Sequence, residues 1–134
     1  MPRHLESEQQ RLFVARFRLD PRTRDWPACA IPNGGRRGKV EASILKAEGV
    51  SAGAPDWVCF ERSPMHPTVD GFGFYVGLAL EFKVDRRPSR ITAQQAWWHE
   101  RLADSGWYVV VVTSAEEAWQ ELCHVYRMAL HPSR

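Results

Sequence analysis

The chain has 134 residues, of which 44% are hydrophobic, 11% aromatic and 25% charged, with a formal net charge of +2. This is an ordinary globular composition, and the length suits one domain with its own hydrophobic core. The longest apolar run, residues 107–112, is too short to span a membrane, and the N-terminus has no apolar signal region. Three cysteines without metal-ligand spacing argue against a disulfide framework or a zinc site. We therefore expect a cytoplasmic protein that does not bind membranes.

Hydrophobic periodicity and turn signals predict alternating helices and strands. In chain order these are a helix over 5–19, a strand over 28–31, a helix over 37–48, strands over 56–61 and 75–84, a helix over 92–105, a strand over 107–112 and a helix over 115–130. The strand over 28–31 ends at a turn over 32–35, and the second helix stops at Gly49. The long connection over 62–74 is expected either to cover the sheet or to wedge into a ligand.

Two acidic motifs lie 25 positions apart in the sequence, at Asp56 and at Glu81. The strand around Glu81 alternates, so that Leu78, Leu80, Phe82 and Val84 share one face and Gly77, Ala79, Glu81 and Lys83 share the other. If the strand that begins at Asp56 pairs with it, two carboxylates converge beside a lysine. Oxygen-rich sites of this kind bind Mg²⁺ or Mn²⁺. Taken alone, Glu81 and Lys83 are equally typical of an exposed ion pair on an edge strand.

Two helices carry a polar residue inside an apolar stripe. In the helix over 37–48, Glu41 lies within the stripe and either pairs with Arg37 or turns toward Asp56 and Glu81 as a third acidic group. In the helix over 92–105, Gln95 interrupts the stripe and also completes the capping box Thr92-x-x-Gln95. If Gln95 is only the cap, Gln94 is the alternative functional residue.

Basic residues flank both acidic motifs in sequence. They form two clusters, Arg36, Arg37 and Lys39 before the second helix and Arg86, Arg87 and Arg90 after Lys83. A phosphate backbone would require such cations around a site whose own carboxylates repel it. The alternative is that they are solvated loop arginines in a chain that uses arginine far more than lysine.

Five stretches taken in order, with their spacing, resemble the VRR-NUC nuclease domain, a branch of the PD-(D/E)XK phosphodiesterases. They are residues 30–37, Glu41-Ala42 with 45–49, Gly53-Ala-Pro-Asp56, Glu81-Phe-Lys83 and residues 92–98. The resemblance spans roughly residues 28–122. It implies an α/β protein with a restriction-endonuclease-like αβββαβ core, in which a central mixed β-sheet is flanked by helices, with an added N-terminal and an added C-terminal helix. Residues 1–27 would form the N-terminal helix and linker, and 28–134 the nuclease domain, within one globular unit.

The resemblance also assigns roles to individual residues. Asp56 and Glu81 would bind Mg²⁺ or Mn²⁺, helped by the Phe82 main-chain carbonyl and by Glu41 as an accessory acid. Lys83 would orient or activate the attacking water, and Gln95 matches the glutamine at the head of the next helix of the family. The valines at 109–112 are not followed by the arginines of the family's namesake motif.

The resemblance implies a DNA endonuclease whose substrate the residues leave open. Small stand-alone members of the family resemble phage and bacterial nucleases that act as homodimers on branched DNA such as Holliday junctions. A C2 dimer supplies the two symmetric cuts that a four-way junction needs. The helix with Phe13 and Phe17, or the pair Trp97 and Trp98, would form that interface. The alternatives are a nicking or flap nuclease of a phage replication or packaging module, and a non-catalytic DNA-binding protein on the same fold.

Overall fold

The computed structural model describes residues 2–32, 38–85, 87 and 90–133, with side chains from residue 5 onward. The elements in chain order are α1 (Pro2–Leu19), β1 (Ala28–Ala30), α2 (Lys39–Ala47), β2 (Trp57–Cys59), β3 (His66–Thr68), β4 (Gly71–Gly73), β5 (Leu78–Phe82), α3 (Ala93–Asp104), β6 (Tyr108–Val112) and α4 (Ala115–Tyr126). Every predicted helix and strand is present, several of them shorter than expected. The predicted connection over 62–74 also contains the hairpin β3–β4.

Four strands form the central sheet in the order β1-β2-β5-β6. The first two neighbouring pairs are antiparallel, while β5 and β6 are parallel and are joined through α3. A parallel pair needs such a crossover, and a helix usually provides it. The predicted mixed sheet is therefore confirmed.

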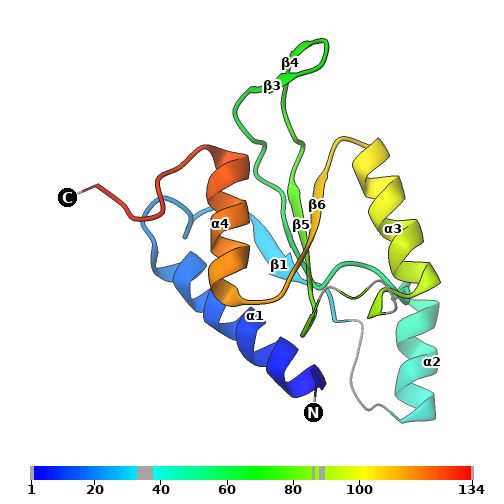
Figure 1. Cartoon of the computed structure of the whole chain (residues 1–134). Coiled ribbons are helices and arrows are strands. Elements are labelled where there is room, and N and C mark those ends of the chain that lie inside the picture. Colours follow the sequence, from blue (N-terminus) through cyan, green and yellow to red (C-terminus); the bar gives the residue numbers. More distant parts are fainter. Residues whose placement is uncertain (1, 33–37, 86, 88–89, 134) are drawn as a thin grey trace.

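Helices cover both faces of this sheet (Figure 1). α1 and α4 pack together on one face, and α3 lies on the other beside β6. The order α1-β1-β2-β5-α3-β6 is the expected αβββαβ core, with α2 inserted between β1 and β2. α1, which was expected as a helix added before the core, therefore supplies the first helix of this core.

The hydrophobic core fills the space between the sheet and the pair α1 and α4. Leu78, Leu80 and Phe82 point into it together, as their alternation predicted. Phe13 of α1 is fully buried and meets Trp57 edge to face at 4.9 Å between ring centroids. Phe17 packs against the same tryptophan, with ring centroids 5.0 Å apart. The N-terminal helix and the sheet thus share one core.

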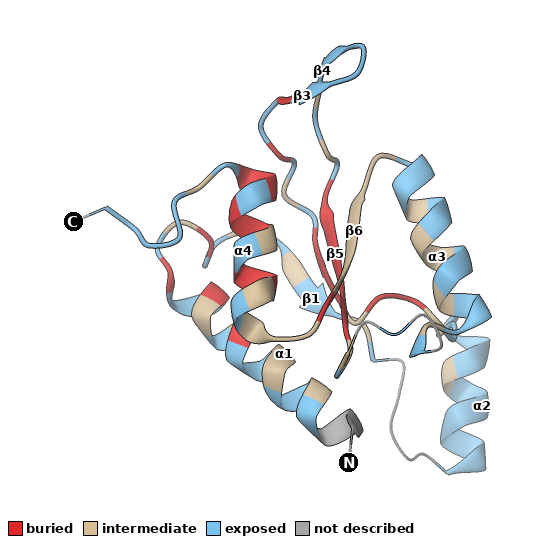
Figure 2. Cartoon of the chain, viewed as in Figure 1, coloured by how far each residue is buried: buried red, intermediate tan, exposed pale blue. Residues whose placement is uncertain are grey.

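α2 packs against none of the other described elements and has no buried residue (Figure 2). Its apolar residues Val40 and Ile44 are 75% and 54% exposed. The prediction that this helix turns its apolar stripe, and Glu41 within it, toward the body of the protein is therefore wrong.

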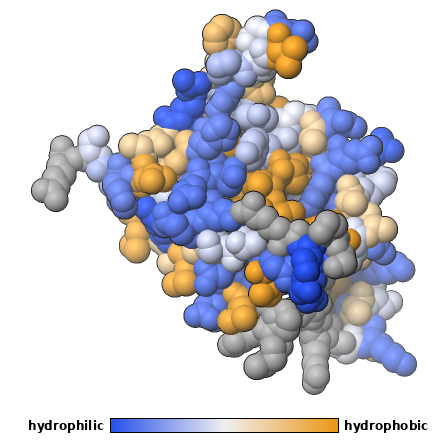
Figure 3. All heavy atoms as spheres, in the orientation of Figure 1, coloured by the Kyte–Doolittle hydropathy of each residue, from blue (hydrophilic) through white to orange (hydrophobic). Residues whose placement is uncertain are grey.

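The hairpin β3–β4 projects beyond the end of the sheet opposite Asp56, so it does not cover the sheet (Figure 1). Apolar side chains gather at its tip (Figure 3), where Val69 and Phe72 are exposed. At its base, His66 is buried, and its Nε2 lies 2.6 Å from the Val125 carbonyl oxygen. None of the described helices combines the length and the hydropathy of a membrane span.

Candidate metal centre

Strand register brings Asp56 and Glu81 together. Trp57 pairs with Leu80 across β2 and β5, so the preceding residue, Asp56, lies opposite Glu81. Opposed residues of an antiparallel pair project to the same face of the sheet. The Asp56 main-chain N–H donates to the Leu80 carbonyl at 3.0 Å, and the Phe82 N–H donates to Asp56 Oδ2 at 2.7 Å. The two carboxylates therefore meet at the end of β5, as predicted from the sequence.

The proximity of two buried acids alters their proton affinity. Burial, reinforced by the neighbouring Glu81 carboxyl, raises the pKa of Asp56 to about 8. Glu81 is only 2% exposed, and burial raises its pKa as well, against the opposing effect of Lys83. Like charges crowded in a poorly hydrated site favour protonation unless a cation compensates them. When both acids are ionised, the pair therefore carries negative charge that requires a cation to compensate it.

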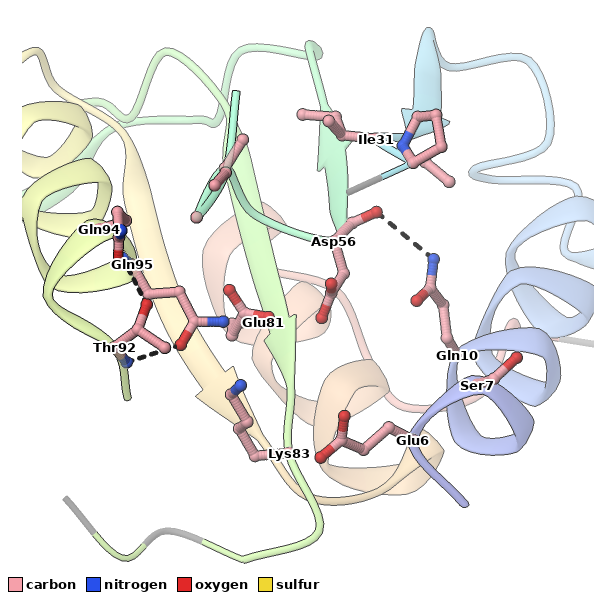
Figure 4. Close-up of a pocket in the computed structure, with 15 residues that line it drawn as sticks. Glu6, Ser7, Gln10, Ile31, Asp56, Glu81, Lys83, Thr92, Gln94 and Gln95 are labelled. Atoms are coloured by element: carbon pink, nitrogen blue, oxygen red, sulfur yellow. Dashed lines mark hydrogen bonds between the residues drawn. The ribbon is translucent and has the colours of Figure 1, made fainter. Parts of the chain in front are cut away.

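The two acids line an open cavity of about 600 Å³ between α1 and α3 (Figure 4). Lys83 follows them on β5 and lines the same cavity, where its charge lowers the pKa of both carboxyl groups. The α1 wall carries Glu6, Ser7 and Gln10, and the α3 wall carries Thr92, Gln94 and Gln95. The cavity therefore combines acids, one lysine and neutral polar groups at the end of the sheet.

Gln95 serves as the predicted helix cap while facing the cavity. The Thr92 N–H donates to Gln95 Oε1 at 2.9 Å, and the Gln95 N–H donates to Thr92 Oγ1 at 3.1 Å. Figure 4 shows the Gln95 side chain directed from α3 toward Glu81. Only the amide oxygen is used by the cap, so the capping role leaves the amide nitrogen for the site. Gln94 also lines the cavity.

A glycine fixes how closely the Asp56 loop approaches α3. Gly53 has a φ of +90°, and a Cβ built there would lie 2.6 Å from the Gln94 main-chain carbon and 2.8 Å from the Gln95 nitrogen. No side chain fits between the loop and the helix at this distance. The lack of a side chain at Gly53 therefore lets the loop before Asp56 lie directly against the first turn of α3.

Glu6 is a cavity carboxylate that the sequence reasoning missed. It lies on α1, and its Oε1 accepts a hydrogen bond from the Val84 N–H at 3.2 Å. Its charge contributes to the raised pKa of Glu81. The available signal was helical spacing, because Glu6, Gln10, Phe13 and Phe17 follow the i, i+4, i+7, i+11 pattern. The two buried phenylalanines turn Glu6 and Gln10 toward the sheet.

His99 is the second residue that the sequence reasoning missed. It lies one helical turn after Gln95, and its Nε2 is 3.6 Å from Glu81 Oε1. Both atoms are buried and have no hydrogen-bond partner among the described residues. Burial and the charge of Lys83 lower the pKa of His99, against the effect of Asp56, so the ring is neutral at pH 7. His99 thus lies next to Glu81 but does not line the cavity.

The remaining predicted site residues that the structure describes do not line the cavity. Glu41 and Lys39 are exposed on α2. Arg87 pairs with Asp85 at 2.8 Å, and Arg90 approaches the same aspartate at 3.9 Å. Arg36, Arg37 and Arg86 lie outside the described residues, as does most of the predicted turn over 32–35. The structure therefore brings Asp56, Glu81, Lys83 and Gln95 together with Glu6, and leaves Glu41 apart.

The donor set at this site fits a hard divalent cation. Within the described residues, no three His, Cys, Asp or Glu side chains gather closely enough to bind a metal by themselves. Asp56 and Glu81 nevertheless offer paired carboxylate oxygens, and Glu81 Oε1 has no hydrogen-bond partner in the described part of the chain. Mg²⁺ and Mn²⁺ are commonly bound by one or two carboxylates, with water completing the coordination shell. A cation would also offset the repulsion between the two acids.

Comparison with known proteins supports the fold. No protein-family model and no curated protein matches the sequence. Among solved structures, the chain is similar to a VRR_NUC domain protein, with a TM-score of 0.68 and 22% sequence identity. The similarity covers 93% of this chain and 90% of the other. The protein therefore has the restriction-endonuclease-like fold, in the form found in a VRR_NUC domain protein, as the sequence resemblance predicted.

Proposed function

We propose that the protein is a Mg²⁺- or Mn²⁺-dependent DNA endonuclease that hydrolyses phosphodiester bonds. The observation that carries this proposal is the convergence of Asp56 and Glu81, beside Lys83, in an open cavity at the end of β5. The fold shared with a VRR_NUC domain protein supports the same class of chemistry. A purely structural ion pair would not require two buried acids with raised pKa values.

Five of the cavity residues have a role in this proposal. Asp56 and Glu81 would hold the cation through carboxylate oxygens, together with the main-chain carbonyl of Phe82. When bound, such an ion lowers the pKa of a coordinated water and stabilises charge on the phosphate. Lys83 would orient that water and balance negative charge at phosphorus. Gln95, through its amide nitrogen, and Glu6 would position groups at the two walls of the cavity.

The proposed substrate is branched DNA, such as a Holliday junction, cut by a homodimer. Phe13 and Phe17 are buried in the protein's own core, so they are not available for a dimer interface. Trp97 is 54% exposed on α3 and is the better candidate. Dimerisation through this face would supply two active sites related by a twofold axis.

The test is a nuclease assay on four-way junction, flap, nicked and linear DNA with Mg²⁺, Mn²⁺ or EDTA. We expect symmetric paired cuts in the junction, and a loss of at least about 100-fold in Asp56→Asn, Glu81→Gln and Lys83→Ala, as for removal of groups that act on the transition state. Selective cutting of flaps or nicks would replace the junction proposal and retain the metal site. Substantial cleavage by both acid variants would refute the metal site itself, and DNA binding without cleavage under any condition would indicate a non-catalytic protein.

A further inference from the structure

The cavity at Asp56 continues into a groove between α1 and the edge strand β1. A second cavity, of about 340 Å³, shares Ser7, Gln10 and Ala30 with the first. A third, of about 130 Å³, shares Val14, Arg18 and Ala30 with the second. The three cavities thus form one path from the acids along the helix, which we call the α1–β1 groove.

α1 presents one stripe of side chains to the cavity at Asp56 and the core, and another stripe to the α1–β1 groove. Glu6, Gln10, Phe13 and Phe17 face the site and the core. The residue that follows each of these four has the same helical spacing and lines the groove. These residues are Ser7, Arg11, Val14 and Arg18. A single helix therefore joins the catalytic cavity to the groove.

The charge changes sign along this path. The first cavity contains Glu6, Asp56 and Glu81, whereas none of the described residues that line the other two is acidic. Arg11 and Arg18 are exposed in the groove, and neither forms an ion pair with any residue that the structure describes. By contrast, Arg16 on another side of α1 pairs with Glu116 at 3.0 Å. The groove arginines are therefore available for an anionic ligand.

A third arginine extends the same path. Arg24 lines the far cavity, and its only ion pair within the described residues is a 4.0 Å contact with the exposed Asp25. Arg11 and Arg18 are seven residues apart in the helix, which corresponds to about 10 Å along its axis. At about 3.4 Å per nucleotide of one DNA strand, these two cations would contact different phosphates.

We infer that the α1–β1 groove binds the phosphodiester backbone of one DNA strand as it leaves the active site. This inference rests on the proposed nuclease function and adds a route for the substrate. It assigns backbone binding to Arg11, Arg18 and Arg24 in place of Arg87 and Arg90, which share the carboxylate of Asp85. The cation at the acids and the arginines in the groove would then neutralise different phosphates along the same strand.

Binding of a fluorescein-labelled single-stranded oligonucleotide, followed by anisotropy in EDTA at several salt concentrations, tests the inference. Three double variants each remove two positive charges: Arg11→Ala with Arg18→Ala, Arg87→Ala with Arg90→Ala, and Arg62→Ala with Arg101→Ala as a control remote from the groove. We expect the first pair to weaken binding at least 10-fold and to reduce the slope of log K against log salt by about 1.4, which is 0.7 for each lost contact to a single strand. The control pair should leave the slope unchanged.

Cys29 provides an independent readout within the groove. It lines the third cavity and is exposed, whereas Cys59 and Cys123 are buried. We expect saturating oligonucleotide to slow alkylation of Cys29 by N-ethylmaleimide several-fold, and the Arg11 and Arg18 variant to lose this protection. Alkylation also detects a variant that fails to fold, because its normally buried Cys59 and Cys123 would then react.

Several outcomes would overturn the inference. They are equal slopes in all three double variants, a loss confined to the Arg87 and Arg90 pair, no binding by the wild-type protein, and no protection of Cys29. Protection by a duplex alone would also overturn it, because the groove would then not follow one strand. If wild type cuts DNA and the Arg11 and Arg18 variant binds with an unchanged slope, the inference fails and the nuclease function stands. If the groove binds DNA and wild type cuts none, the inference about the groove stands and the nuclease function fails.

Discussion

The helices α1 and α2 are both amphipathic and both carry a glutamate, but only one of them belongs to the site. Phe13 and Phe17 anchor α1 against Trp57, and the same helix places Glu6 in the cavity. α2 has the stronger apolar stripe of the two and buries none of it. A carboxylate is thus brought to the cavity of the two acids by the packing of its helix, and an apolar stripe alone does not ensure that packing.

The contrast also explains the shape of the site. α1 lies against the sheet on one side of the cavity, and α3 with Gln95 lies on the other. α2 enters the chain between β1 and β2, so it is an insertion into the core order and the sheet is complete without it. The core can therefore tolerate changes in α2 that it cannot tolerate in α1.

The largest expected effect is on stability, from truncating one anchor in each helix. Phe13→Ala removes a fully buried ring and should lower the free energy of unfolding by about 3–5 kcal/mol. Ile44→Ala, on exposed α2, should change it by no more than about 0.5 kcal/mol. Urea denaturation followed by tryptophan fluorescence measures both. Similar losses in the two variants would show that α2 packs in solution and would remove the contrast.

The next effect concerns activity and compares the two glutamates. Glu6→Gln should reduce cleavage about 10- to 100-fold, as for groups that support metal ligands, because Glu6 lies in the cavity and holds the Val84 N–H. Glu41→Gln should retain nearly full activity because Glu41 is exposed outside the cavity. Initial rates on the best DNA substrate, with unfolding measured for each variant, separate activity from stability. A larger loss in Glu41→Gln would restore that residue as the accessory acid.

The centre of the site could be predicted from the sequence because it depends on local rules. Alternation along β5 places Glu81 on one face, and a strand with Asp56 opposite Glu81 turns Trp57 to the core face with Leu80. The capping box at Thr92 and Gln95 is likewise a local pattern, and the structure confirms it. The order of helices and strands followed from the same periodicity.

The walls of the site depend on tertiary packing, which single-sequence patterns do not contain. His99 approaches Glu81 only because α3 crosses the sheet beside β6, and Glu6 approaches only because α1 packs with α4. The apolar stripe of α2 indicated a packed helix, yet no described element lies against it. Helical spacing gives the face of a helix but not the surface that it meets.

The smallest expected effect is a pH dependence of stability in metal-free protein, and it separates the buried acids from the exposed one. In an unfolded chain the pKa of an aspartate is about 3.9, whereas burial and Glu81 raise the pKa of Asp56 to about 8 in the folded protein. Between these values the folded state binds a proton that the unfolded state does not, so the free energy of unfolding falls as pH rises from about 4 to about 8. Burial also raises the pKa of Glu81, which acts in the same direction.

Comparing variants separates this effect from that of His99. The pKa of His99 is lowered in the folded protein, so the free energy of unfolding falls as the pH drops below the usual pKa of histidine. Asp56→Asn in EDTA should reduce the loss of stability between pH 5 and pH 8 by at least about 1.4 kcal/mol, the equivalent of one pKa unit. Glu41→Gln should keep the wild-type slope, because Glu41 is exposed on α2 and lies outside the cavity. Saturating Mn²⁺ at pH 8 should stabilise wild type more than Asp56→Asn, since a cation stabilises the state that binds it. Identical slopes in wild type and Asp56→Asn would show that Asp56 is ionised without cost in the folded protein, and the electrostatic basis of the metal site would then be lost.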